Sequence, residues 1–148
     1  LRKAVPNISL TTDIIVGFPG ETEQDFQETL DLVHNANFEG AFTFIFSARE
    51  GTPAAKYVDD TPNETKKDRL NRLNKVINEG YLRGNKRFEG EIVEVLVEGI
   101  SPKNPNMVSG YTEHNKLVNF PGTIDMVGEL VKVKIEQAYS WHLKGKKA

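Results

Sequence analysis

The spacing of hydrophobic positions changes twice in the first part of the chain. Residues 9–16 end in an unbroken apolar run before a glycine, which is typical of a buried parallel strand. Apolar residues then recur at helical spacing, at Phe26, Leu30 and Val33, and predict one face of a helix. Residues 41–46 are aromatic and β-branched, which predicts a second strand. The order strand, helix, strand indicates a βαβ unit with parallel strands.

Capping residues predict where two helices begin. Thr22 is a suitable N-cap, and Asp25 follows at the spacing of a capping box. A second start combines Thr61 as N-cap, Pro62 at the first helical position and Glu64 as the box partner. We expect this second helix to end at the two glycines near residues 80–84, which weaken a helix. Its apolar stripe consists of Leu70, Leu73, Ile77 and Tyr81.

From residue 88 the hydrophobic spacing shortens to two. Val131, Val133 and Ile135, for example, alternate with charged residues, as in a strand with one buried face. The candidate strands are residues 88–98, 107–112, 116–120, 130–137 and 139–143. Short strands separated by Gly and Pro turns predict a small closed all-β barrel of the OB type.

Composition narrows the possible functions. The chain has 148 residues, 38% hydrophobic and 27% charged, with a formal net charge of −2. This is typical of a soluble globular protein, and no apolar run approaches the roughly 18 residues that span a membrane. The absence of cysteine excludes disulfides, thiolate metal sites and a cysteine nucleophile in this chain, and it fits a cytoplasmic location. The scattered histidines predict no metal site and no catalytic residue.

Basic residues concentrate in the second predicted helix. Residues 62–87 contain eight basic and three acidic residues, a net charge of +5. Such a segment either faces an anion such as phosphate or is a solvated helix face.

Two segments follow the predicted parallel strands, at the edge where α/β folds bind ligands. The first runs from Asp13 through Gly17 to Glu21 and opens a helix. It lacks the Gly-Lys-Ser/Thr of a nucleotide-triphosphate loop, and the alternative is a tight turn that requires glycine. The second, Phe46-Ser-Ala-Arg-Glu-Gly-Thr-Pro53, carries Arg49, which either holds an anionic group or pairs with a nearby glutamate.

A polar and aromatic stretch, residues 103–122, covers two strands of the predicted barrel. Small barrels bind single-stranded or looped RNA by stacking and backbone contacts. The candidate RNA-binding residues are Lys103, Asn106, Tyr111, Asn115, Lys116, Asn119 and Phe120. The alternative is that Phe120 is a core residue and the amides form turns.

These motifs carry a resemblance to a known family. Thr12-Asp-Ile-Ile-Val-Gly-Phe-Pro-Gly-Glu-Thr22 and Phe46-Ser-Ala-Arg-Glu-Gly-Thr-Pro-Ala54 resemble the radical S-adenosylmethionine methylthiotransferases. The stretch Met107–Gly122 resembles the TRAM domain of the tRNA branch, and within it the tRNA 2-methylthio-isopentenyladenosine synthases. That family adds a methylthio group to C2 of N6-isopentenyladenosine beside the anticodon.

The resemblance implies that this chain is the C-terminal part of a longer enzyme and is inactive alone. We expect part of a radical S-adenosylmethionine barrel at residues 1–61, a basic connecting helix at 62–87 and a TRAM domain at 88–148. The implied cofactors are S-adenosylmethionine and two [4Fe–4S] clusters, whose cysteine ligands this chain lacks. By position, the implied cofactor-binding residues are Asp13, Gly17, Glu21, Phe46, Ser47 and Arg49.

The implied partner is a tRNA anticodon stem-loop, with no membrane contact. An exposed strand edge in the first part of the chain predicts self-association. Two alternatives remain open. One is a sibling methylthiotransferase acting on threonylcarbamoyladenosine in tRNA or on a ribosomal protein, and the other is a stand-alone RNA-binding module.

Overall fold

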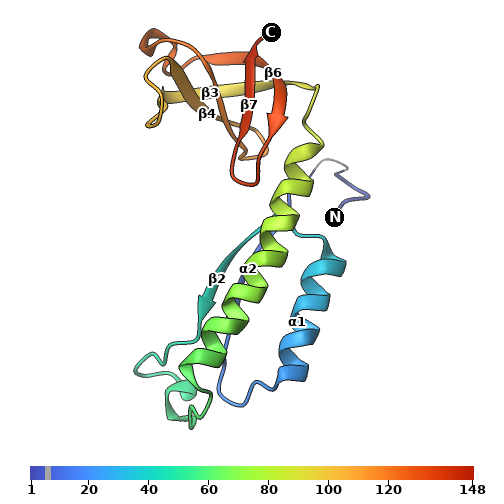
Figure 1. The fold of residues 1–148 in the computed structure, drawn as a ribbon, viewed down its shortest axis with the longest axis vertical. Helices are drawn as coiled ribbons and strands as arrows, with labels where there is room; N and C mark the ends of the chain where they lie inside the picture. The colour runs from blue at the N-terminus through green and yellow to red at the C-terminus, as the bar shows by residue number, and fades with distance from the viewer. Residues whose placement is uncertain (6–7) are drawn as a thin grey trace. The chain divides into compact units, whose positions relative to one another are not determined.

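A computed structural model describes residues 1–5 and 8–148. The chain divides into two compact units, Leu10–Gly80 and a second unit that combines Leu1–Ser9 with Tyr81–Ala148. Helix α2 (Asn63–Lys86) contributes to both, because the division falls after Gly80 (Figure 1).

The first unit is built on two parallel strands. β1 (Thr11–Val16) pairs with β2 (Gly40–Ile45), and α1 (Glu23–Ala36) connects them. The predicted strand, helix, strand order and the parallel pairing are confirmed. A short 3-10 helix, η1 (Pro53–Lys56), precedes α2.

The first turn of α1 has the predicted capping box. The Thr22 Oγ1 accepts a hydrogen bond from the Asp25 N–H at 3.1 Å, and the Asp25 carboxylate accepts one from the Thr22 N–H at 2.8 Å. Hydrogen bonds from the Thr22 backbone and hydroxyl lower the pKa of Asp25, because they favour its charged form. Phe26 and Val33 on the predicted apolar face are buried.

Helix α2 differs from the prediction at both ends. It begins at Asn63, and the Pro62 carbonyl accepts the Lys66 N–H, so the proline precedes the helix. It continues past both glycines to Lys86, because tertiary packing outweighs the cost of about 1 kcal/mol per glycine. Leu73 and Ile77 of the predicted stripe are buried.

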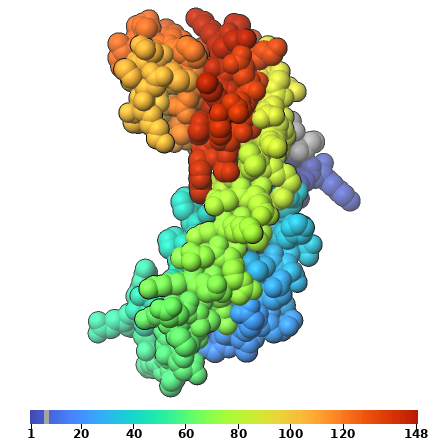
Figure 2. Space-filling view, viewed as in Figure 1, coloured from blue at the N-terminus to red at the C-terminus, as the bar shows by residue number. Residues whose placement is uncertain are grey.

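The second unit is a closed five-stranded barrel. Its strands are β3 (Ile92–Ile100), β4 (Met107–Thr112), β5 (Leu117–Pro121), β6 (Leu130–Ala138) and β7 (Leu143–Lys147). The spatial order is β3-β4-β5-β7-β6, and β6 pairs back onto β3 to close the barrel, as predicted. The 3-10 helix η2 (Ile124–Met126) lies between β5 and β6. In Figure 2 the C-terminal strands, drawn in red, form a continuous surface of this unit.

The predicted last strand is wrong. Residues 139–142 form a tight turn, in which the Tyr139 N–H donates to the His142 carbonyl at 2.9 Å, and the strand follows at Leu143–Lys147. The prediction failed because the turn contains aromatic residues, which are common in strands. The lysine- and glycine-rich β7 has little strand propensity, but it is paired on both sides, with β6 and β5.

The inward-facing residues of the barrel form one hydrophobic core. Its fully buried members include Val95, Val97, Val108, Val118, Phe120, Val133 and Leu143. The alternating positions of these strands face outward and carry the side chains available for binding. Among the described residues, no helix combines the length and apolar character needed to cross a membrane.

Candidate nucleic-acid interface and strand-end cluster

Gly17 and Glu21 bind to each other at the end of β1. The Gly17 N–H lies 3.1 Å from each carboxylate oxygen of Glu21. The Arg69 guanidinium of α2 donates to the same carboxylate at 2.7 Å and to the Glu21 carbonyl at 3.0 Å. Both residues are therefore engaged by the protein itself, and their contact with a cofactor stays a prediction.

The backbone at Gly17 explains why glycine stands there. Its φ is +72°, a region that favours glycine, and a Cβ at this position would lie 2.6 Å from the Lys66 Cγ. Lys66 is itself buried and forms an ion pair with Asp59. The geometry supports the tight-turn interpretation of this segment.

Much of the positive charge of α2 is paired within the first unit. Arg69 binds Glu21, and Arg72 binds Glu23 at 2.7 Å. The Glu23 hydrogen bond raises the pKa of Arg72, and Arg72 in turn lowers the pKa of Glu23. We expected this segment either to bind an anion or to be a solvated helix face. Arg69 and Arg72 do neither, because they pair with glutamates of the protein. They tie α2 to the start of α1.

Aromatic side chains gather beside the second strand end. The Phe18 ring lies edge-on to Phe46 and Tyr57, with centroids 5.0 Å and 5.9 Å apart. Ser47 and Arg49 are exposed directly after β2. Exposed aromatic faces with a hydroxyl and a guanidinium fit the purine, ribose and carboxylate groups of an adenosyl cofactor. Asp13, farther back in β1, is exposed.

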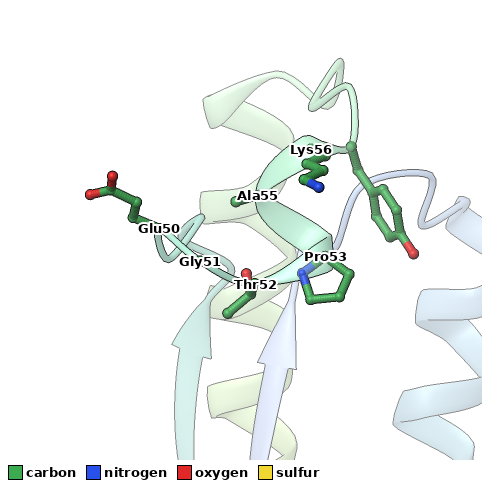
Figure 3. A pocket seen from close by; sticks show the side chains of 7 residues that line it. Glu50, Gly51, Thr52, Pro53, Ala55 and Lys56 are labelled. Atoms are coloured by element: carbon green, nitrogen blue, oxygen red, sulfur yellow. The ribbon is translucent and has the colours of Figure 1, made fainter.

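A hollow of about 530 Å³ lies in the following loop (Figure 3). Glu50, Gly51, Thr52, Pro53, Ala55, Lys56 and Tyr57 line it. None of the predicted cofactor-binding residues belongs to this lining, and the Glu50 side chain extends away from η1. With no cysteine in the sequence, and no cluster of other candidate ligands among the described residues, the chain does not fit an iron–sulfur cluster.

The barrel carries a polar and aromatic hollow of about 390 Å³ beside strands β4, β5 and β7. Two loops border it, residues 101–106 between β3 and β4 and residues 139–142 between β6 and β7. Its lining consists of Ser101, Lys103, Asn104, Met107, Leu117, Asn119, Trp141, His142 and Lys144. In OB-type barrels, the second and third strands with these two loops form the oligonucleotide-binding face.

Loop 139–142 is held rigidly by the end of α2. The buried Asn85 donates from Nδ2 to the Tyr139 carbonyl at 2.7 Å and to the Ser140 carbonyl at 3.1 Å. Tyr81 packs against Trp141, with ring centroids 4.7 Å apart. These contacts hold the backbone of the loop and restrict the Trp141 ring.

Electrostatics around this hollow favour an anionic ligand. Lys103 and Lys144 are exposed at its border. His142 stacks on Tyr139 with centroids 4.6 Å apart, and burial followed by the nearby Lys103 charge lowers its pKa. The neutral imidazole thus offers a hydrogen-bonding group beside two lysine charges.

The structure brings only part of the predicted RNA-binding set to this hollow. Lys103 and Asn119 line it, and Asn106 lies in the same loop as Lys103. Asn106 helps to close that loop, because its N–H donates to the Asn104 side chain at 3.0 Å.

The other predicted residues lie elsewhere on the barrel. Tyr111 is partly exposed at the end of β4, and Asn115 forms the following turn with a φ of +56°. Lys116 is mostly buried, and its N–H donates to the Thr112 hydroxyl. Phe120 is a fully buried core residue, so the alternative stated for it holds: a ring without exposed surface cannot stack on a base.

Trp141, His142 and Lys144 line the hollow but are absent from the residues predicted from the sequence. The sequence did contain a signal for them, because the single tryptophan of the chain stands next to a histidine and close to several lysines. Assigning residues 139–143 to a strand concealed that pattern, because half of a strand's side chains would have faced the core.

Comparison with known proteins assigns the barrel to a domain family and shows which enzymes the chain is similar to. Residues 86–148 match the TRAM domain family, so this barrel is a TRAM domain. Over 145 residues, 98% of the chain, the sequence is 56% identical to the tRNA-2-methylthio-N(6)-dimethylallyladenosine synthase of Bacillus cytotoxicus. The proteins of the same name from Bacillus licheniformis and Bacillus subtilis are 57% and 54% identical over the same length. Over nearly its whole length the chain is similar to part of these synthases, which confirms the resemblance.

The similarity covers only part of each relative, because the chain spans about 28% of the length of these curated proteins.

Proposed function

We propose that this chain is the C-terminal part of a tRNA methylthiotransferase and that its TRAM barrel binds tRNA. The observation that carries the proposal is the hollow between loops 101–106 and 139–142, where exposed lysines, amides and an aromatic ring meet on one face. These groups suit phosphates, base edges and base faces. The names of the relatives give the substrate class, and a cytoplasmic location follows from a tRNA substrate.

The rest of the whole enzyme supplies the chemistry. We propose residues 1–61 as part of a radical S-adenosylmethionine barrel, 62–87 as its connecting helix and 88–148 as the TRAM domain. Phe46, Ser47 and Arg49 then border the adenosyl cofactor, supported by their position after β2 and by the exposure of Ser47 and Arg49. When bound in the whole enzyme, S-adenosylmethionine supplies the radical and the methyl group, and any iron–sulfur cluster is held by residues outside this chain.

The first prediction tests the binding of tRNA. A tRNA anticodon stem-loop should bind the chain more weakly as salt rises, because binding releases counterions from phosphates. Replacing Lys103 and Lys144 together with alanine should weaken binding and reduce the salt slope by about two phosphate contacts. Fluorescence anisotropy with a labelled stem-loop, at several salt concentrations, measures both quantities.

The matched control is Lys132→Ala, an outward lysine of β6 that lies opposite Glu94 of β3. It should leave the salt slope nearly unchanged. No binding at the lowest salt concentration would remove the RNA-binding role.

A second prediction tests the branch of the family. In a strain lacking the whole gene, mass spectrometry of tRNA nucleosides should find N6-isopentenyladenosine without its methylthio group. Loss of the methylthio group from threonylcarbamoyladenosine, or from a ribosomal protein, would assign the gene to a sibling branch instead. Unchanged methylthio levels everywhere would favour a stand-alone RNA-binding module.

A further inference from the structure

We propose that Trp141 is a stacking platform for one unpaired nucleotide of the RNA, with the neighbouring phosphates bound by Lys103 and Lys144. The inference rests on the proposed RNA-binding function and assigns it to a particular ring. Trp141 is 64% exposed although it is the largest aromatic side chain of the barrel unit, and it borders the hollow of about 390 Å³. An exposed indole at a binding face provides a broad π surface for a base.

Contacts within the barrel unit preorganise the Trp141 ring for stacking. Tyr81 lies against it at 4.7 Å and an interplanar angle of 42°, which restricts its movement. Asn85 fixes the loop backbone through two hydrogen bonds, and Tyr139 stacks on His142 within the same loop. This ordering reduces the conformational entropy that is lost when a base binds, so more of the stacking energy contributes to affinity.

The surrounding groups favour an unpaired nucleotide over a duplex. Inside a duplex, both faces of a base are already covered by its neighbours, so an indole cannot stack on it without unpairing. A flipped or single-stranded base exposes its face and also its pairing edge. Asn104, Asn119 and His142 line the same hollow and provide donors and acceptors for that edge.

Another surface of the barrel offers a contrast. A second hollow is lined by the exposed Leu96, Leu130 and Tyr111, together with the carboxylates of Glu94 and Glu113. Carboxylates repel phosphate, so aromatic exposure on that surface does not predict RNA contact. Tyr111 therefore serves as the matched aromatic control.

The experiment uses the fact that Trp141 is the only tryptophan of the chain. A short single-stranded RNA with the sequence of an anticodon loop should quench the intrinsic tryptophan fluorescence on binding. A fully paired duplex of equal charge, at the same low salt concentration, should quench much less at equal occupancy. Anisotropy of labelled RNA gives the occupancy independently of the quench.

Three variants test the role of the ring. Trp141→Leu should weaken single-stranded RNA binding roughly 5- to 100-fold, as expected for loss of one stacked base. Trp141→Phe should recover most of the affinity, and Tyr111→Leu should leave it within about twofold. Circular dichroism and thermal unfolding compare the fold of all three variants with the parent chain.

The outcomes separate this inference from the proposed function. RNA binding without quenching, equal quenching by the duplex, or a folded Trp141→Leu variant of unchanged affinity would overturn the stacking role while leaving RNA binding intact. Should Trp141→Leu misfold, the parent quench and the Trp141→Phe affinity still decide the question. Absence of all RNA binding would instead overturn the proposed function.

Discussion

At the scale of the residue, Gly17 joins β1 to α1 under two constraints. Its φ of +72° is unfavourable for a side chain, and Lys66 occupies the space of a Cβ. We predict that Gly17→Ala lowers the free energy of unfolding by about 2–4 kcal/mol, combining backbone strain with overpacking. Urea unfolding followed by far-ultraviolet circular dichroism measures the loss.

Gly20 is the matched control for this prediction. Its φ is +84°, but nothing lies within 4 Å of the position that a Cβ would take. Gly20→Ala should therefore cost only the backbone strain, about 1–2 kcal/mol. Equal losses in the two variants would show that contact with Lys66 is unimportant.

Other single residues show where sequence reasoning succeeds. The capping pair Thr22 and Asp25 was predictable, because it depends on groups three residues apart. The partner of Glu21 was not, because Arg69 is distant in the sequence and several arginines were equally eligible. Lys103 and Asn119 were predicted as RNA-binding residues, but Trp141 was not, because it is distant in the sequence and only the fold brings it to the same hollow.

At the scale of the element, β7 depends on its neighbours. A Cβ at Gly145 would overlap the Lys134 carbonyl oxygen of β6. We predict that Gly145→Ala destabilises the barrel by about 1–3 kcal/mol, because the strands must move apart. Trp141 fluorescence during urea unfolding reports on this unit, and Gly99→Ala, which meets nothing within 4 Å, should be nearly neutral. An equally destabilised Gly99→Ala variant would contradict this explanation.

Hydrophobic periodicity predicted the strands and helices whose buried and exposed residues alternate regularly along the sequence. Strands such as β6 alternate buried valines with exposed lysines and were recognised from that alternation. β7 lacks such a pattern, and its place is set by pairing with β5 and β6. Helix α2 likewise passes its glycines because its length depends on packing.

At the scale of the whole molecule, the first unit exposes part of its sheet. The described sheet contains only β1 and β2, and Ile15, Phe42 and Phe44 are 56%, 70% and 52% exposed on it. We predict concentration-dependent self-association of this chain, because the two-stranded sheet has unpaired edges and an exposed apolar face that a second copy can cover. Sedimentation analysis should detect it, and Phe44→Lys should suppress it. Val58→Lys, a substitution at an exposed loop position, should have no effect. A monomer at every accessible concentration would refute this prediction.

From local spacing and capping, the amino-acid sequence alone predicted the βαβ order, the basic helix, a small closed barrel and four of its five strands. It also contained enough of the family motifs to indicate a methylthiotransferase. Which side chains share a surface depends on the three-dimensional fold. The barrel closes by pairings between distant residues, which bury Phe120 and bring loops 101–106 and 139–142 around one hollow. Such long-range pairing follows from packing and leaves no local trace in the chain.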